Sequence, residues 1–294
     1  MIVVTAPTGH IGRQVVRNLL DRGAPVRVIA RDPSRLTPES RDRLDVVPGS
    51  HADADVVAKA FAGADAVFWL VPPDPRAGSV TAAYVDFTRP AGAAFTSQGV
   101  NRVVGVSALG RGTAVAGQAG LVTASLAMDD LIAGTGVSYR ALTMPSFMDN
   151  ILRQVDALRN HGVFVAPIAG DRKFPSCATR DIAAVATDLL LDDSWSGPGS
   201  VPVLGPEDLS YEDMAAVMSE VLARPIRFQR IPGEDLRAGL LGRGMSEPMA
   251  QATLEMWQAK DAGLDNAEPR TPQATTPTAF RQWCEDVLRP AVLA

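Results

Sequence analysis

The first two thirds of the chain alternate short β-branched runs with amphipathic stretches of helical length. This alternation is the pattern of βαβ units, in which crossover helices join parallel strands. The strands are continuously apolar and bordered by helices, which indicates a sheet covered on both faces. We therefore predict an α/β fold built on a doubly wound parallel sheet, with a smaller, mostly helical C-terminal region.

The alternation also predicts where the elements and domains lie. Strands are predicted at residues 2–5, 26–30, 44–47, 66–70, 102–106, 138–142 and 201–204, and helices at 11–22, 54–61, 80–98, 123–135, 147–160 and 181–191. After residue 205 the alternation fades, so we place one domain at 1–205 and a second at 206–294, with elements from 144–180 contributing to the second. Ser210 is predicted to cap a helix, with Asp213 at the capping-box position.

Composition excludes several classes of protein. A chain of 294 residues with 46% hydrophobic and 21% charged residues is that of an ordinary globular protein. The net charge of −5 and the lack of a basic block do not suggest nucleic-acid binding. No apolar run approaches the length that spans a bilayer. We expect a soluble cytoplasmic protein, a monomer or homodimer, with Cys177 and Cys284 as reduced thiols and no metal site.

The opening stretch MIVVTAPTGHIGRQVV joins a predicted strand to a glycine turn. Gly9 and Gly12 stand where the second and third glycines of a dinucleotide fingerprint would be, and Ala6 occupies the first place. Pro7 removes one N–H donor from the turn. The loop predicts binding of a pyrophosphate at the following helix start. The alternative is that the altered loop has lost the nucleotide.

Arg31 directly follows the second predicted strand, 22 residues past Gly9, where an acidic residue would otherwise bind the ribose of NAD. An arginine there can bind the 2′-phosphate of NADP, with Arg35 as a second contact. The alternative is a pair of solvated charges after a strand. The position relative to Gly9 favours the first interpretation, with NADP(H) preferred over NAD(H).

Several segments, in the same order along nearly the whole chain, resemble the NmrA-like branch of the atypical short-chain dehydrogenases/reductases. They are TAPTGHIGRQVV, AGADAVFWLVPP, VNRVVGVSALG, GVSYRALTMPSFMDNI and LGPEDLSYEDMAAVMSEVL. The resemblance implies a Rossmann-like NAD(P)-binding domain with a C-terminal substrate cap. It implies either reduction of quinones, azo compounds or specialised metabolites, or NAD(P)-dependent regulation without turnover.

The loop, Arg31 and the resemblance together predict the site residues. Cofactor-binding positions are Thr8, Gly9, His10, Ile11, Gly12, Arg31, Arg35, Val71, Pro72, Ser107 and Pro145. Substrate-binding positions are Trp69, Met144, Phe147, Met148 and Asn150. As a group, these apolar side chains and the methionines of the C-terminal region favour a flat or apolar ligand. For any single one of them, ordinary packing in the core is the alternative explanation.

Two departures from the family pattern bear on chemistry. Ser50 stands where an acidic residue often follows the third strand, and TASLAMDDLIAGTG contains neither the tyrosine nor the lysine of the superfamily's Tyr-x-x-x-Lys. Ser107, Asp129, Tyr84 and His10 are the remaining candidates for a catalytic group. Their alternatives are, in turn, a strand-end hydroxyl, a helix-surface carboxylate, a packing residue and a helix-start side chain.

Three functions fit these observations. The first is an NAD(P)H-dependent oxidoreductase acting on an aromatic, quinonoid or specialised-metabolite acceptor, since hydride transfer to such an acceptor needs no tyrosine. The second is a non-catalytic protein that senses NAD(P). The third is a redox-neutral cyclase or dehydratase on a reductase scaffold that has stopped using the nucleotide.

Overall fold

The computed structural model describes all 294 residues, which form two compact units. The first unit comprises residues 1–107, 124–143 and 182–201, and the second comprises 108–123, 144–181 and 202–294. The division is therefore not a single break after residue 205. Segments that leave the carboxyl ends of two strands of the first unit, at residues 108 and 144, belong to the second.

The first unit contains a seven-stranded sheet. Its strands are β1 (Ile2–Val4), β2 (Val26–Ala30), β3 (Asp45–Pro48), β4 (Ala66–Trp69), β5 (Arg102–Ala108), β6 (Ser138–Met144) and β10 (Pro198–Pro202). Their order is β10-β6-β5-β4-β1-β2-β3, with parallel pairing from β3 through β5. The predicted doubly wound sheet is confirmed, and β1 and β4 are the neighbours at which the strand order reverses.

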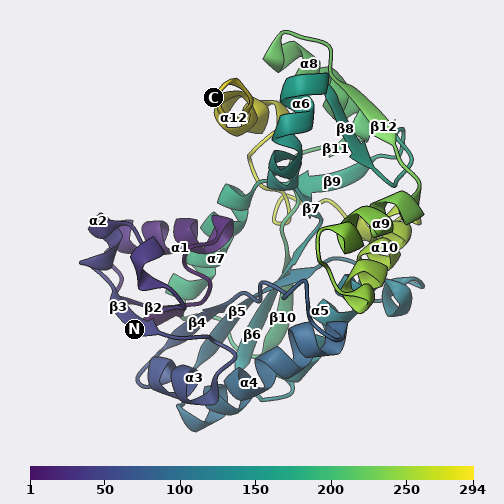
Figure 1. The fold of residues 1–294 in the computed structure, drawn as a ribbon. Helices are drawn as coiled ribbons and strands as arrows, with labels where there is room; N and C mark the ends of the chain where they lie inside the picture. Colours follow the sequence, from purple (N-terminus) through teal and green to yellow (C-terminus); the bar gives the residue numbers. More distant parts are fainter. The chain divides into compact units, whose positions relative to one another are not determined.

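Crossover helices cover both faces of this sheet (Figure 1). On one face lie α3 (Ala54–Phe61), α4 (Phe87–Ser97) and α5 (Leu121–Ala133), and on the other α1 (His10–Asp21) and α7 (Thr179–Leu191). The helix predicted at residues 11–22 is confirmed as amphipathic, because its apolar stripe of Ile11, Val15, Val16, Leu19 and Leu20 is buried. Burying such a stripe is what holds a helix of this length on a sheet.

The core of the first unit lies between the sheet and the α3–α5 layer. Phe61 stacks on Phe95 with ring centroids 5.2 Å apart, and Trp69 meets Phe95 edge-on at 6.0 Å. The indole Nε1 of Trp69 donates to the Thr88 hydroxyl at 3.3 Å, so its one polar atom is satisfied. Large aromatic side chains thus fix how the helices lie over β4 and β5.

The second unit is helical with two small sheets (Figure 1). One sheet has the order β11 (Asp208–Leu209), β9 (Phe174–Cys177), β7 (Ser146–Phe147), and the other pairs β12 (Arg227–Arg230) with β8 (Val163–Ala166). The helices are α6 (Val155–His161), α8 (Tyr211–Leu222), α9 (Gly233–Gly242), α10 (Glu247–Asp261), α11 (Phe280–Trp283) and α12 (Arg289–Leu293). The capping box of Ser210 and Asp213 at the start of α8 is confirmed.

Two predicted helices differ from the structure. Residues 80–98 form a π-helical turn, Ala82–Asp86, followed by α4, which contains Pro90. Residues 147–160 begin with Phe147 in β7, continue as a 3-10 helix over Met148–Gln154 and become α-helical only in α6. Pairing of β7 with β9 holds Phe147 in an extended conformation, which overrides local helical periodicity.

The seventh strand is also shifted from its predicted place. It spans Pro198–Pro202 instead of residues 201–204, and Leu204 forms an isolated bridge to Thr275. Helix α2 (Pro38–Arg41), capped by the Thr37 side chain, was not predicted because it is only four residues long.

Candidate functional site

The turn after β1 keeps the backbone of a glycine turn although its first residue is alanine. Ala6 has φ +48°, one of two positive-φ residues in the chain that are not glycine. Its carbonyl accepts a hydrogen bond from the Gly9 N–H at 3.1 Å. A Cβ on Gly12 would lie 2.2 Å from that carbonyl oxygen, so Gly12 must remain glycine for the helix to approach the turn. The sequence change has left the shape of the loop intact, at a cost of about 1 kcal/mol for the left-handed alanine.

Helix α1 starts from this turn with its N–H groups uncapped. Gly9 is the N-cap residue, no side chain caps the helix, and no acidic residue lies in its first turn. Gly9 and His10 are exposed. A guanidinium nitrogen of Arg13 lies 3.5 Å from Nδ1 of His10. The Arg13 side chain therefore adds a positive charge to the positive end of the helix dipole. A helix start with free N–H groups and no competing carboxylate binds an anion such as a pyrophosphate.

Arg31 and Arg35 lie just beyond the end of β2, and both are exposed. Neither side chain makes a hydrogen bond or ion pair with another residue of the protein. The nearby carboxylate, Asp32, instead accepts from the backbone N–H and hydroxyl of Ser34, and these bonds hold its pKa below the usual range. The arginines therefore remain available to a ligand phosphate, while Asp32 caps its own turn.

The ends of β1 and β4 are tied together by Thr5. Its Oγ1 accepts from the Leu70 N–H at 2.8 Å and donates to the Phe68 carbonyl at 3.0 Å. Val71 follows β4 as a buried residue, Pro72 is exposed and Pro73 is half-buried. The switch point between β1 and β4 is thus braced by side-chain hydrogen bonds, and open α/β sheets bind their ligands outside the strand ends at this point.

His51 lies between β3 and α3, and no role was predicted for it. Its Nε2 lies 3.1 Å from the Leu70 carbonyl oxygen, and its ring meets those of Trp69 and Phe87 edge-on at 5.2 and 4.8 Å. Burial lowers the pKa of His51 to about 4, against the raising effect of the Leu70 carbonyl. A carbonyl only accepts, so Nε2 carries the proton and the neutral ring braces the end of β4.

At the end of β5, Ser107 belongs to a buried hydrogen-bond network with α5 and β6. The Ser107 hydroxyl donates to one oxygen of Asp129, and the Tyr139 hydroxyl donates to the other at 2.6 Å. Their exposed fractions are 6% for Ser107, 4% for Asp129 and 2% for Tyr139. The interpretation of Asp129 as a helix-surface carboxylate is wrong, because the sheet-facing side of α5 carries it into the core.

Gly105 makes room for this network. It lies two residues before Ser107 on β5, so both face the same side of the sheet. A Cβ on Gly105 would lie 2.3 Å from the Tyr139 hydroxyl oxygen. Only a glycine at this position lets Tyr139 reach across to Asp129.

Other predicted residues of the first unit are packing residues. Trp69 is fully buried in the core of the unit and offers no surface to a ligand in this structure. Tyr84 packs half-buried against the same core, and burial raises the pKa of its hydroxyl to about 12. A phenol with so high a pKa is a poor proton donor at neutral pH.

The residues predicted after β6 all fall in the second unit, with different exposures. Met144 and Pro145 are buried, Phe147 is half-buried and Asn150 is exposed. Met148 belongs to the hydrophobic core of the second unit, with its terminal methyl close to Gly205. Its core position places it away from ligand contact, whereas Phe147 and Asn150 keep accessible surface.

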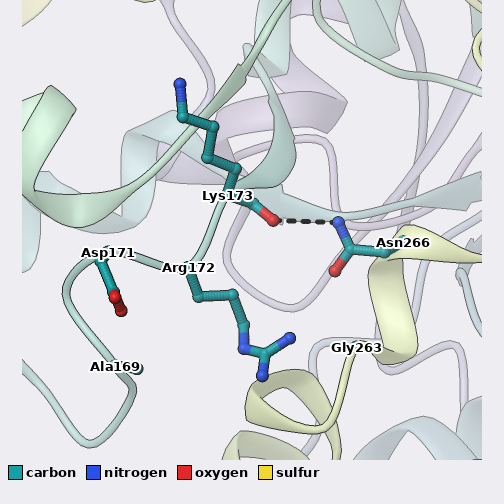
Figure 2. A pocket seen from close by; sticks show the side chains of 6 residues that line it. All are labelled: Ala169, Asp171, Arg172, Lys173, Gly263 and Asn266. Atoms are coloured by element: carbon teal, nitrogen blue, oxygen red, sulfur yellow. Dashed lines mark hydrogen bonds between the residues drawn. The ribbon is translucent and has the colours of Figure 1, made fainter.

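A pocket of about 390 Å³ lies on the second unit, lined by Ala169, Asp171, Arg172, Lys173, Gly263 and Asn266 (Figure 2). Its cations have carboxylate partners, with Arg172 3.5 Å from Asp261 and Lys173 3.4 Å from Asp213. The Asn266 amide donates to the Lys173 carbonyl at 2.9 Å. This lining is polar and internally paired, and it includes none of the residues predicted to bind substrate.

The two cysteines are not activated as nucleophiles. Cys177 and Cys284 are buried and unpaired, and burial raises the pKa of both thiols, that of Cys284 to about 12. No group of three or more His, Cys, Asp and Glu side chains is arranged to hold a metal ion. No helix combines the length and the apolar character needed to cross a bilayer.

A doubly wound parallel sheet with a glycine turn at its switch point is the architecture of dinucleotide-binding α/β proteins. The chain belongs to the NAD(P)H-binding family, whose model matches residues 7–193, and within it to the NmrA-like atypical short-chain dehydrogenases/reductases.

Relatives of known activity cover nearly the whole chain. A (4-alkanoyl-5-oxo-2,5-dihydrofuran-3-yl)methyl phosphate reductase of Streptomyces griseus is 32% identical over 286 residues, 96% of each chain. An NAD(P)H azoreductase of Xenophilus azovorans is 28% identical over 257 residues, 87% of this chain and 86% of the relative. The crystal structure of a Citrobacter triphenylmethane reductase with NADP(H) superimposes with a TM-score of 0.79 at 19% identity, covering 99% of this chain and 100% of that one. The chain is an NAD(P)H-dependent reductase.

The residues present fit a nicotinamide dinucleotide. The first turn of α1 has no side-chain cap, the close approach of Gly12 to the Ala6 carbonyl keeps the helix start against the turn, and the strand order reverses between β1 and β4. Sequence reasoning identified this turn but missed Tyr139, Gly105 and His51. For Tyr139 and Gly105, the Gly-x-Ser pattern at the end of β5 was the sequence feature that could have indicated them. His51 had no such feature, because its role depends on packing against Trp69 and Phe87.

Proposed function

We propose that this reductase uses NADP(H) in preference to NAD(H) and reduces electron-poor conjugated acceptors. The observation that carries the cofactor preference is the unpaired Arg31 at the end of β2 beside an Asp32 that is already engaged with Ser34. A guanidinium binds a phosphate through two parallel hydrogen bonds, and an arginine in this place accommodates the 2′-phosphate.

The chain's own groups divide the work of holding the cofactor. The N–H groups at the start of α1 bind the pyrophosphate, Arg31 and Arg35 bind the adenosine end, and Ser107 lies at the nicotinamide end. When bound, the nicotinamide supplies the hydride. The protein holds the acceptor against it and excludes water, while the braced switch point at Thr5 keeps the strand ends fixed.

The relatives' names support an acceptor with an extended conjugated system. An alkanoyl-substituted oxo-dihydrofuran accepts hydride at a carbon of its conjugated double bond and the electron pair moves to the carbonyl oxygen, whereas an azo compound accepts hydride at one nitrogen and the electron pair moves to the other. In each case the anion takes its proton from water. No strong acid beside the substrate is needed, which agrees with the missing Tyr-x-x-x-Lys and with the weak acidity of Tyr84.

The loop geometry bears on the redox-neutral alternative. That alternative rested on Ala6, Pro7 and Ser50, but the backbone at Ala6 keeps the positive φ of a glycine and Gly12 keeps its close approach. A turn with this shape supports continued use of the nucleotide, so the redox-neutral reading loses its main motivation.

Calorimetric titration with NADPH and NADH tests the cofactor preference. We expect micromolar binding of NADPH by the wild type. In Arg31→Ala, loss of a charge-assisted phosphate contact worth about 1.5–3 kcal/mol weakens NADPH binding by about 10–100-fold and leaves NADH binding unchanged. Arg17→Ala is the matched control, because Arg17 is an exposed arginine of α1 without an ion pair.

Acceptor turnover tests the second half of the proposal. NADPH oxidation is followed at 340 nm with a quinone, an azo dye, an acyl butenolide and an isolated ketone. Turnover of conjugated acceptors with a silent ketone supports the proposal. Preference for the ketone, or NADPH binding without turnover of any acceptor, overturns it.

A further inference from the structure

The Ser107–Asp129–Tyr139 network fixes the direction of a hydrogen bond. A serine hydroxyl has a single hydrogen and two lone pairs. In the structure that hydrogen points to Asp129, since the Ser107 hydroxyl donates to the carboxylate. The oxygen of Ser107 is left able only to accept from any further group.

The place of Ser107 in the fold determines which part of a dinucleotide lies near it. The glycine turn follows β1 and the arginines follow β2, on one side of the switch point. Ser107 ends β5, on the other side, beyond β4. A dinucleotide binds across the switch point with its two mononucleotide halves on opposite sides, so the nicotinamide half falls to β4 and β5.

We propose that Ser107 accepts a hydrogen bond from the carboxamide N–H of the bound nicotinamide, and that Asp129 and Tyr139 are positioning residues that hold it in this acceptor role. This inference rests on the proposed use of NADP(H). A hydroxyl whose hydrogen were free would bond equally well to the carboxamide oxygen or to a substrate oxygen. Asp129 removes that choice.

Tyr139 makes the arrangement rigid. Its hydroxyl donates to the second oxygen of Asp129 at 2.6 Å, and it lies in space that a Cβ on Gly105 would occupy. With one oxygen held by Tyr139 from β6, the other faces Ser107 on β5. Buried polar networks of this kind fix a single conformation when their members are satisfied.

The acceptor role has a consequence for the substrate. An acceptor-only Ser107 does not stabilise an oxyanion, so this residue does not supply the donor that reduction of an isolated carbonyl requires. Conjugated acceptors, which spread the charge over their own atoms, do not need that donor. The network therefore deepens the proposed function by explaining the acceptor class through hydrogen-bond direction.

The test compares binding of NADP⁺ with its 3-acetylpyridine analogue, which carries a methyl group in place of the carboxamide NH₂. The wild type is expected to bind NADP⁺ about 10-fold more tightly, the value of one hydrogen bond of about 1.4 kcal/mol. Ser107→Ala reduces the preference to within twofold. Asp129→Asn does the same, because an asparagine NH₂ donates to Ser107 and releases its hydrogen. Tyr139→Phe, which keeps the carboxylate, loses about threefold of the preference.

Two controls separate a change in the direction of the Ser107 hydrogen bond from a change in folding. Binding of 2′,5′-ADP, which reaches only the adenosine half, stays unchanged in every variant. Ser125 is a buried serine of α5, one helical turn before Asp129, and Ser125→Ala keeps the full preference for NADP⁺.

Each outcome decides the inference. A wild type with equal affinity for both dinucleotides, or a Ser107→Ala variant that still prefers NADP⁺, overturns it while leaving the cofactor assignment standing. A wild type that binds neither NADP⁺ nor 2′,5′-ADP overturns the proposed function itself, and the inference with it.

Discussion

The two halves of the first unit's sheet present opposite kinds of polar group at their carboxyl ends. Beyond β1 and β2 the groups are exposed and unpaired: the uncapped start of α1 and the Arg31 and Arg35 side chains. Beyond β5 the groups are buried and paired, with Ser107, Asp129 and Tyr139 bonded to one another.

The difference agrees with the proposed roles of the two halves. Phosphates are charged and strongly hydrated, so free cations and N–H groups near solvent bind them without first breaking internal bonds. A nicotinamide carboxamide is neutral and is distinguished by donor and acceptor direction, which only a fixed partner can read. In the proposed binding mode, the first half supplies charge and the second supplies orientation.

The largest expected loss of cofactor binding at the first half of the sheet comes from Gly12→Ala. The new Cβ would meet the Ala6 carbonyl at 2.2 Å, so α1 or the turn must shift. Overpacking costs of about 1–3 kcal/mol concentrated at the turn should weaken NADPH binding by about 100-fold. Titration calorimetry measures the effect. Gly78→Ala is the control, since no atom lies within 4 Å of its added Cβ, and equal losses in both variants would refute a binding role for the turn.

The matching change in the second half is Gly105→Ala. Its Cβ would displace the Tyr139 hydroxyl from Asp129, adding a clash to the loss of a buried hydrogen bond. We expect the free energy of unfolding to fall by about 3 kcal/mol, measured by denaturant titration. Gly92→Ala, a buried helical glycine with only an ordinary contact at 3.5 Å, should leave stability unchanged or improved. A Gly105→Ala protein as stable as wild type would show that Tyr139 does not need the gap.

A third prediction concerns His51, a buried and uncharged side chain that packs at the end of β4. Its pKa is about 4 in the folded protein and about 6.5 when unfolded, so the unfolded chain binds the extra proton between those values. Stability should therefore rise with pH from about 4 to 6.5, by up to about 3 kcal/mol from this group.

Denaturant titrations across that pH range measure the slope. His51→Gln keeps a donor for the Leu70 carbonyl but does not titrate, so its slope should be smaller than that of the wild type. His161→Gln, at an exposed histidine, should retain the wild-type slope. Identical slopes in all three proteins would mean that His51 is protonated or accessible in the folded state.

The smallest expected effect comes from Ala6→Gly. Glycine adopts positive φ without a Cβ penalty, so relief of about 1 kcal/mol should partly offset the greater entropy of the unfolded chain. NADPH affinity should change by less than about threefold, because the loop already has the required shape. Ala223→Gly is the control, at the other non-glycine residue with positive φ, remote from the loop in sequence. A large gain in NADPH affinity in Ala6→Gly alone would show that the alanine had closed the site.

Local patterns predicted the elements that depend on local interactions. The apolar stripe of α1 and the capping box of Ser210 and Asp213 are confirmed because both involve residues three or four positions apart. The 3-10 helix over Met148–Gln154 was missed because the Gln154 side chain bonds across the chain to both backbone groups of Val165. Short strands such as β7 and β11 exist only through their pairing with β9.

The sequence by itself determined the doubly wound sheet and the places of Gly9, Gly12 and the two arginines relative to its strands, because strand alternation and motif spacing are local quantities. The tertiary structure alone decided that Ala6 keeps a glycine conformation and that Trp69 and Met148 are core residues. It also decided that Asp129 is buried between Ser107 and Tyr139. These features join residues from different strands and helices, and the direction of a hydrogen bond is set only when both partners have been brought together.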